Sequence, residues 1–187
     1  MRHTAQGSKL VTNLDLTIQP VPESRIPDFR KLVEDYWWEL MRTAKSVRDE
    51  DSRTEYFNQR FQWNSKHEPP YWALESETPV AFIHFALNSR ATIHDFYVVP
   101  EARRRGVGSS VVRWALEYFD SKGVNQIDLT ARRDQPASLA FWESQGFTIG
   151  HYELIMHRDP ATGTAYRGAL SSDFTESDLG YDTWKER

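Results

Sequence analysis

The chain has 187 residues, a net charge of −4, no cysteine, and 39% hydrophobic and 27% charged residues. This composition is typical of a soluble globular domain with a sizeable core. The negative charge argues against general nucleic-acid binding, and the missing cysteines exclude disulfides, thiolate metal sites and a catalytic thiol. No secretory signal or membrane-length apolar run is found, so we expect a cytoplasmic protein.

The first half predicts a strand, two helices and a hairpin. Residues 1–12 are polar and are expected to be a flexible N-terminal segment. Hydrophobic residues alternate in the next segment and then recur at helical spacing. The expected elements are a strand over 14–18, a helix over 28–45, a second helix over 52–61, and a hairpin of 71–75 with 79–87.

A strand, a glycine-containing turn and an amphipathic helix follow. The apolar run 93–99 predicts a strand that Pro100 closes. Apolar residues recur at helical spacing from Val107 to Phe119, and Gly123 is placed to end that helix. The turn between them holds three arginines and two glycines. We therefore expect a mixed α/β fold, with helices on the faces of the sheet.

The C-terminal part predicts a short strand over 127–130, a helix over 135–145 and a last strand or hairpin over 147–157. Residues 159–187 then turn acidic. The expected organisation is one domain over 13–158, with residues 159–187 as an acidic extension outside its core.

The turn Arg103–Ser110 has the chemistry of an anion site. Free amides at a helix start, aided by the helix dipole, bind phosphate well. Glycine at 106 and 108 lets the backbone approach a ligand closely. The turn lacks the Gly-Lys-Ser/Thr of a Walker loop, and Val111 stands where a dinucleotide fingerprint has its third glycine.

The pattern Arg103-x-x-Gly106-x-Gly108 resembles the acetyl-coenzyme A signature of the GNAT superfamily, Gln/Arg-x-x-Gly-x-Gly/Ala. The later segment 138–147, which ends in Gly-Phe, resembles the family's second recognisable helix. Together they cover roughly residues 14–157. The resemblance implies a central, mostly antiparallel sheet, splayed at the coenzyme-binding strand and flanked by helices.

The resemblance also implies how the coenzyme is held. Successive amides from Arg104 to Ser109 would bind the pyrophosphate, and the pantetheine arm would run beside 96–98. The Val98 amide would polarise the thioester carbonyl. The expected coenzyme-binding residues are Phe96, Tyr97, Val98, Arg103, Arg104, Arg105, Gly106, Val107, Gly108, Ser109, Gln135, Ser138, Phe141 and Trp142.

The chain departs from the family at the proton donor. Many members carry a tyrosine where this chain has Trp142, and an indole N–H does not ionise usefully. Either the thiolate leaves without help, or a hydroxyl of Ser138, Tyr97 or Tyr152 protonates it. Gln135 replaces the family's frequent asparagine at the start of the helix.

For the general base, the strand offers His94 and Asp95. Simple alternation places His94 on one face with Phe96 and Asp95 on the other with Tyr97. His94 has a suitable intrinsic pKa and matches a histidine of arylalkylamine acetyltransferases. A carboxylate base needs burial or a charged neighbour to raise its pKa, and His84 is a lesser candidate. The alternative for His94 is a purely structural histidine.

An aromatic cluster in the first half is expected to form core and, in part, the acceptor side. Adjacent Trp37 and Trp38 cannot face the same way on a helix, so one of them should line a pocket or an interface. Trp37, Trp38 and Trp72 are the expected substrate contacts. Aromatic walls suit an amine through cation–π contact.

We therefore expect an N-acetyltransferase that moves an acetyl group from acetyl-CoA to a primary amine of a small molecule by direct attack on the thioester. One alternative is a non-catalytic acyl-CoA sensor or interaction module. Another is a protein or peptide N-terminal acetyltransferase. No metal, nucleic acid or membrane partner is expected, and a homodimer is left open.

Overall fold

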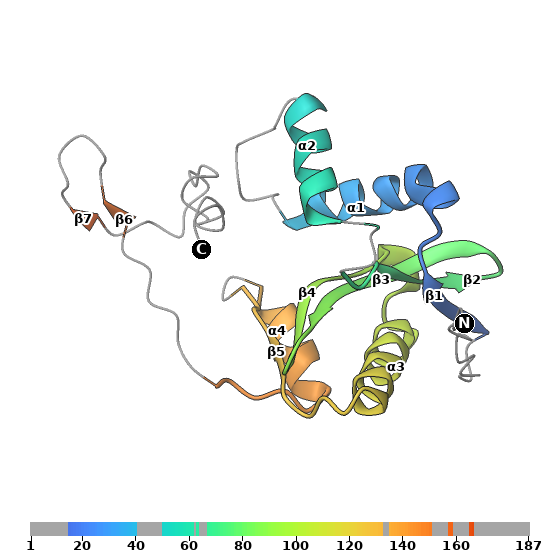
Figure 1. Ribbon diagram of the computed structural model, residues 1–187. Helices are drawn as coiled ribbons and strands as arrows, with labels where there is room; N and C mark the ends of the chain where they lie inside the picture. Colours follow the sequence, from blue (N-terminus) through green and yellow to red (C-terminus); the bar gives the residue numbers. More distant parts are fainter. Residues whose placement is uncertain are drawn as a thin grey trace. The chain divides into compact units, whose positions relative to one another are not determined.

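The computed structural model describes residues 15–40, 50–61, 63, 67–132, 135–150, 157–158 and 165–166 (Figure 1). The chain divides into two compact units. The first comprises Met1–Val33 and Glu55–Ala131, and the second comprises Glu34–Thr54 and Arg132–Arg187. No helix in the described part of the chain is long and apolar enough to cross a membrane.

The first unit is built on a five-stranded sheet of order β1-β2-β3-β4-β5. The strands are β1 (Leu16–Pro20), β2 (Tyr71–Glu75), β3 (Thr78–Leu87), β4 (Ala91–Val98) and β5 (Ile127–Leu129). Neighbours from β1 to β4 are antiparallel, whereas β5 runs parallel to β4. The mostly antiparallel mixed sheet agrees with the expected fold class.

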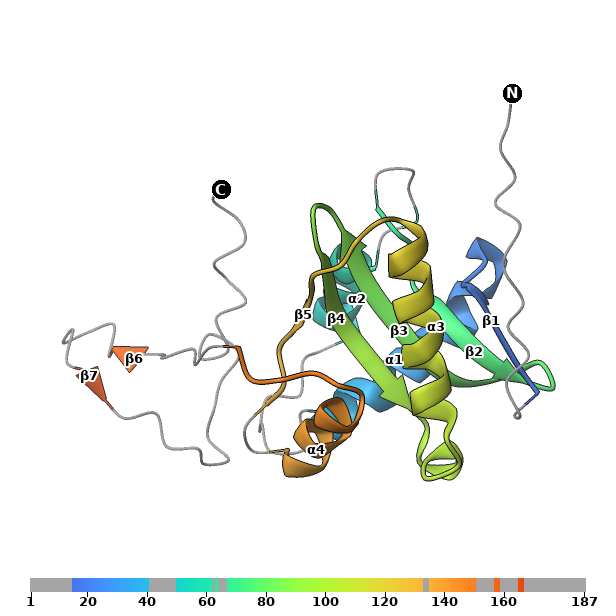
Figure 2. The ribbon, with the colours of Figure 1, turned by 90° about the horizontal axis from the view of Figure 1, so that it is seen from below.

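Helices pack on both faces of this sheet. Helix α3 (Val107–Ser121) covers one face, where Phe119 meets Phe85 edge-on at 4.8 Å (Figure 2). On the other face, Phe29 of α1 (Ile26–Leu40) and Phe61, just after α2 (Glu50–Arg60), both contact Phe82 of β3. These buried aromatic residues fix the sheet between two apolar layers.

Two short 3-10 helices and a tight turn complete the first unit. The 3-10 helices are η1 (Glu23–Arg25) and η2 (Pro100–Ala102). The hairpin of β2 and β3 turns on Ser76 and Glu77, both at positive φ. A two-residue turn of this kind matches the right-handed twist of its strands.

The second unit contains α4 (Pro136–Ser144) and a small strand pair, β6 (His157–Arg158) with β7 (Ala165–Tyr166). Gly146, at φ 93°, ends α4, and the N–H of Phe147 bonds the Trp142 carbonyl. The strand expected from residue 147 is wrong for 147–150, which have no regular structure. Two of the expected segments lie outside the described residues: 1–12, and 159–187 apart from β7.

Candidate functional site

The turn between β4 and α3 presents an uncapped helix start. Gly106 stands at the N-cap with φ 84°, and no side chain caps the helix there. Ser110 donates its N–H to the Gly106 carbonyl, and the three amides before it fall within the first turn, where a helix offers no carbonyl. The amides of Val107, Gly108 and Ser109 are therefore the ones that an anion can use at this position.

The three arginines of the turn have three different surroundings. Arg103 donates from Nε to the Val98 carbonyl at 2.8 Å and lies over the Tyr97 ring. Arg105 forms an ion pair with Glu75 of β2 at 2.6 Å. Arg104 is exposed and has a positive φ of 59°. Arg103 thus ties the turn to β4, and Arg105 ties it to β2.

Strand β4 has an open edge next to this turn. Its parallel pairing with β5 covers only Ala91 to Ile93, so no described strand lies on that side from His94 onward. Val99 donates its N–H to Val80 of β3 at 3.0 Å. Because amides alternate along an antiparallel ladder, the Val98 amide points away from β3, toward the open edge. The sheet is therefore splayed at β4, as the family resemblance implies.

A β-bulge interrupts β4 at His94. His84 of β3 pairs with Asp95 and Phe85 pairs with Ile93, which leaves His94 as the extra residue. His94 lies 5.6 Å from His84, ring to ring, and Asp95 contacts the same His84. The expected placement of His94 and Asp95 on opposite faces is wrong, because the bulge breaks the alternation.

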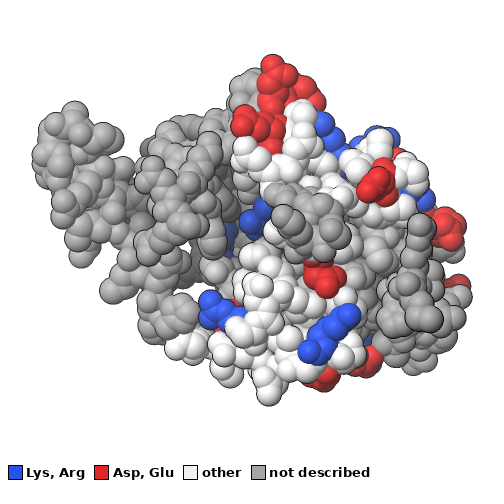
Figure 3. Space-filling model, in the orientation of Figure 1, with Lys and Arg blue, Asp and Glu red and all other residues white. Residues whose placement is uncertain are grey.

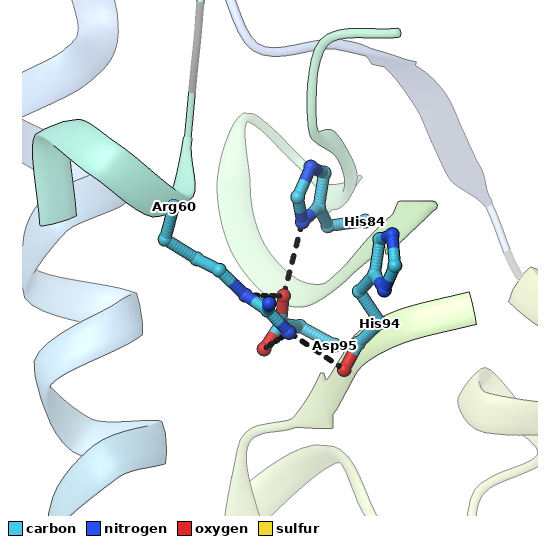
Figure 4. A network of polar contacts seen from close by, with 4 residues as sticks. All are labelled: Arg60, His84, His94 and Asp95. Carbon is cyan, nitrogen blue, oxygen red and sulfur yellow. Dashed lines mark hydrogen bonds and ion pairs between the residues drawn. The ribbon is translucent and has the colours of Figure 1, made fainter. Parts of the chain in front are cut away.

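A polar network surrounds the bulge (Figure 4). Asp95 is 5% exposed, and its carboxylate accepts from His84 Nδ1 at 3.0 Å and from Arg60 Nε at 2.9 Å. A second Arg60 nitrogen donates to the other Asp95 oxygen and to the His94 carbonyl, each at 3.3 Å. Sequence reasoning missed Arg60, since no local pattern marks an arginine that lies 35 residues before its partner.

The network sets the protonation of these groups. Burial, the Arg60 charge and His84 lower the pKa of His94 to about 4, against the opposing effect of Asp95. Burial alone would raise the pKa of Asp95, but His84 and Arg60 together hold it below its usual value. At neutral pH His94 is therefore uncharged and Asp95 is a carboxylate. The raised pKa that a base at Asp95 requires is not found.

The three expected substrate tryptophans differ in exposure. Trp38 is 57% exposed, whereas Trp37 and Trp72 are buried. Trp72 is 1% exposed and carries the Arg25 guanidinium over its ring at 4.9 Å. Trp72 is thus a core residue in this structure, and its contact with a substrate stays a prediction.

Helix α4 of the second unit carries the remaining expected coenzyme contacts. Gln135 is its N-cap residue, and its carbonyl accepts the Ser138 N–H. Trp142 is buried and packs edge-on against Phe141 and Phe147. Gln135, Ser138 and Phe141 are only partly exposed. The Trp142 indole therefore has a packing role within its own unit.

The described residues offer no cluster of three His, Asp or Glu side chains that could hold a metal. On the face drawn in Figure 3, basic and acidic side chains of the described part are interspersed. The site thus combines a helix start with free amides, an open strand edge and a neutral histidine.

Comparison with known proteins places this arrangement in a family. The acetyltransferase (GNAT) family model matches residues 30–147. An uncharacterised N-acetyltransferase of Methanocaldococcus jannaschii is 30% identical over 57 residues, which are 30% of this chain and 25% of its own. N-acetyltransferase family 8 member 3 of Rattus norvegicus is 29% identical over 91 residues, 44% of this chain and 40% of its own. The matches thus span less than half of these relatives.

Solved structures share the fold. An aminoglycoside acetyltransferase from an uncultured soil metagenomic sample, in complex with sisomicin, has a TM-score of 0.58 at 18% identity. It is matched over 77% of this chain and 95% of its own. AAC(6')-Iy, in complex with the bisubstrate analog CoA-S-monomethyl-acetylneamine, has a TM-score of 0.60 at 14% identity over 77% and 98%. The family match over residues 30–147 shows that this chain belongs to the GNAT family of acetyltransferases.

Proposed function

We propose that this chain is an acetyl-CoA-dependent N-acetyltransferase that acts on a primary amine of a small molecule. The observation that carries the proposal is the uncapped start of α3 directly after the open edge of β4. The helix start suits a phosphate group, and the open strand edge suits the extended pantetheine arm. The two lie within ten residues of each other in the chain.

The turn fits the phosphates of the coenzyme. The amides from Arg104 to Ser109 would bind the pyrophosphate, aided by the positive end of a 15-residue helix. Arg104 is exposed and would add its charge, whereas Arg103 and Arg105 would act mainly by holding the turn on β4 and β2. Glycine at 108 would leave room for the backbone to approach a phosphate.

The edge of β4 fits the rest of the coenzyme. Phe96, Tyr97 and Val98 would lie beside the pantetheine arm, and the outward Val98 amide would donate to the thioester oxygen. One preorganised donor of this kind lowers a barrier by about 3 kcal/mol. When bound, acetyl-CoA would supply the activated acetyl group. Gln135, Ser138, Phe141 and Trp142 are proposed as further coenzyme contacts from α4.

His94 is proposed as the base that accepts the amine proton. Its imidazole is neutral at physiological pH and can accept a proton, and its lowered pKa makes it a weaker base than a free imidazole. Asp95 is already bound to His84 and Arg60, which suits a group that orients its neighbours better than one that abstracts a proton. Ser138 remains proposed as a group that protonates the thiolate.

Two observations support a small-molecule amine as the acceptor. The solved structures of similar fold include an aminoglycoside acetyltransferase in complex with sisomicin and AAC(6')-Iy in complex with a bisubstrate analog. Trp38 on α1 gives an exposed aromatic ring that could contact a cationic acceptor. We also propose that the protein acts in the cytoplasm and without a nucleic-acid partner.

The test is release of free thiol from acetyl-CoA in the presence of an amine panel. The panel should hold aminoglycosides, polyamines, arylalkylamines and peptides with free N-termini. We expect turnover with at least one small amine. Coenzyme binding without transfer to any amine would instead support the non-catalytic alternative, and turnover only with peptides would support N-terminal acetylation.

The coenzyme site has its own test in Gly108→Val. A branched side chain in the first turn of α3 would occupy the space proposed for a phosphate, so calorimetry should detect no coenzyme A binding. Gly150→Ala is the matched control, because a Cβ there meets nothing within 4 Å. Unchanged affinity in Gly108→Val would move the coenzyme away from this turn.

A further inference from the structure

Arg60 joins the end of α2 to the bulge of β4. Its guanidinium makes three hydrogen bonds to two consecutive residues, two to the Asp95 carboxylate and one to the His94 carbonyl. Figure 4 shows the side chain reaching from the helix across to the strand. Asp95 is 5% exposed and the Arg60 side chain is 26% exposed, so water competes little for these bonds.

The bulge is the point at which β4 changes its pairing with both neighbouring strands. It is the point at which the pairing with β3 shifts by one residue and the pairing with β5 has ended. A bulged residue lacks a direct ladder partner, so its direction depends on other contacts. The planar fork of an arginine can bind a carboxylate and a carbonyl at fixed angles, which an ammonium group cannot reproduce.

We propose that Arg60 is a positioning residue for acetyl transfer: it locks the bulge, and through the bulge it sets the place of the His94 imidazole. This inference rests on the proposed function for its kinetic consequence. Its structural part, the control of His94 by Arg60, holds for the protein in the absence of any substrate.

The charges around His94 support a link between Arg60 and this ring. Among the described residues, Arg60 of α2, His84 of β3 and Asp95 of β4 act on the charge of His94. Arg60 and His84 oppose a proton on His94, and Asp95 favours one. Loss of the Arg60 charge should therefore raise the pKa of His94.

The kinetic test compares Arg60→Lys and Arg60→Met with the wild type. Lysine keeps the charge and so leaves Asp95 paired, but it cannot make the same three bonds. We expect kcat to fall on the order of 10- to 100-fold in both variants, because small displacements of a reacting group have effects of this size. The Kd for coenzyme A should stay within about twofold, because the turn at Arg104–Ser109 is untouched.

The matched control is Arg53→Met in the same helix. Arg53 pairs with Glu50 at the start of α2. Its kcat should equal that of the wild type. If Arg60→Met does not fold, Arg60→Met/Asp95→Asn removes both buried charges together, and the same fall in kcat is expected.

A second readout needs no turnover. The NMR titration of the His94 ring should move to higher pH in Arg60→Met, by about one unit, and should stay near the wild-type position in Arg60→Lys. Unchanged kcat in both variants, or an unchanged His94 titration in Arg60→Met, would overturn the role of Arg60. A wild type that acetylates no amine would overturn the proposed function alone, since the titration still decides the link between Arg60 and His94.

Discussion

His94 is a histidine whose surroundings oppose its protonation. Burial removes water from the ring, and the Arg60 guanidinium adds a positive field. The pKa of about 4 lies below the usual 6.5, so the folded protein binds this proton more weakly than the unfolded chain does. Proton binding and folding are therefore linked at this residue.

The free energy of unfolding should fall as the pH drops from about 6.5 to about 4. In this window the unfolded chain protonates His94 first, which favours unfolding. His94→Gln removes this contribution, so its stability should decline less, by roughly 1–2 kcal/mol over the window. Urea unfolding at pH 7 and pH 4.5 measures the difference.

His67→Gln is the control for this prediction, since His67 is exposed. It should keep the wild-type loss of stability. The Asp95 carboxylate affects stability at lower pH, because its pKa in the folded chain is held below its usual value. Its contribution to the free energy of unfolding is lost only as the pH falls through this lowered pKa. If His94→Gln and the wild type lost the same stability between pH 7 and pH 4.5, the half-buried, neutral state of His94 would be contradicted.

At the residue scale, the sequence identified His94 and Asp95 but not their arrangement. Side chains alternate along a regular strand, but a bulge breaks the alternation. No residue type in 93–96 indicates that a bulge is present. Arg60 was missed for a related reason. Its partners come close only after α2 and β4 have packed, which no motif reports.

At the element scale, the hairpin turn of β2 and β3 stores local strain. Ser76 and Glu77 have φ of 48° and 68°, a region that side chains with a Cβ adopt at a penalty. The sequence predicts the turn from its position between two apolar runs. It does not show the two positive φ angles, because Ser-Glu lacks the Asn-Gly signature of such turns.

Glu77→Gly should therefore stabilise the protein. Glycine adopts positive φ freely, and we expect a gain of roughly 0.5–1 kcal/mol after its larger chain entropy is included. Thermal unfolding should show a rise of about 2 °C. Glu77→Ala keeps a Cβ and should give no gain. A lower melting temperature in Glu77→Gly would contradict this turn geometry.

The strand, turn and helix around Gly106 were predictable because their signals are local. Pro100 follows the strand, glycine stands at the left-handed N-cap and Gly123 follows the helix. The splay of the sheet has no such local signal. It arises because β5, which follows only after α3, pairs with just three residues of β4. The sequence implied the splay only through the family resemblance.

At the scale of the whole molecule, stability and ligand binding are linked. A ligand that binds the folded chain and not the unfolded chain stabilises it by mass action. The proposed site uses backbone amides of a helix start and a strand edge, which exist only in the folded state. Coenzyme A should therefore report on the intact fold, even before an acceptor amine is known.

Coenzyme A at about 100 times its Kd should stabilise the protein by about 2.7 kcal/mol. For a chain of this size that corresponds to a rise in melting temperature on the order of 5–10 °C. Pantetheine, which lacks the phosphates, should give a much smaller shift at the same concentration, because the amides of Val107–Ser109 would have no anion to bind. Gly108→Val should lose the shift with coenzyme A and keep the small shift with pantetheine, which places no phosphate at the turn. Equal shifts in melting temperature with coenzyme A and pantetheine would mean that the strand edge supplies the binding energy. The helix start would then be excluded as the phosphate site.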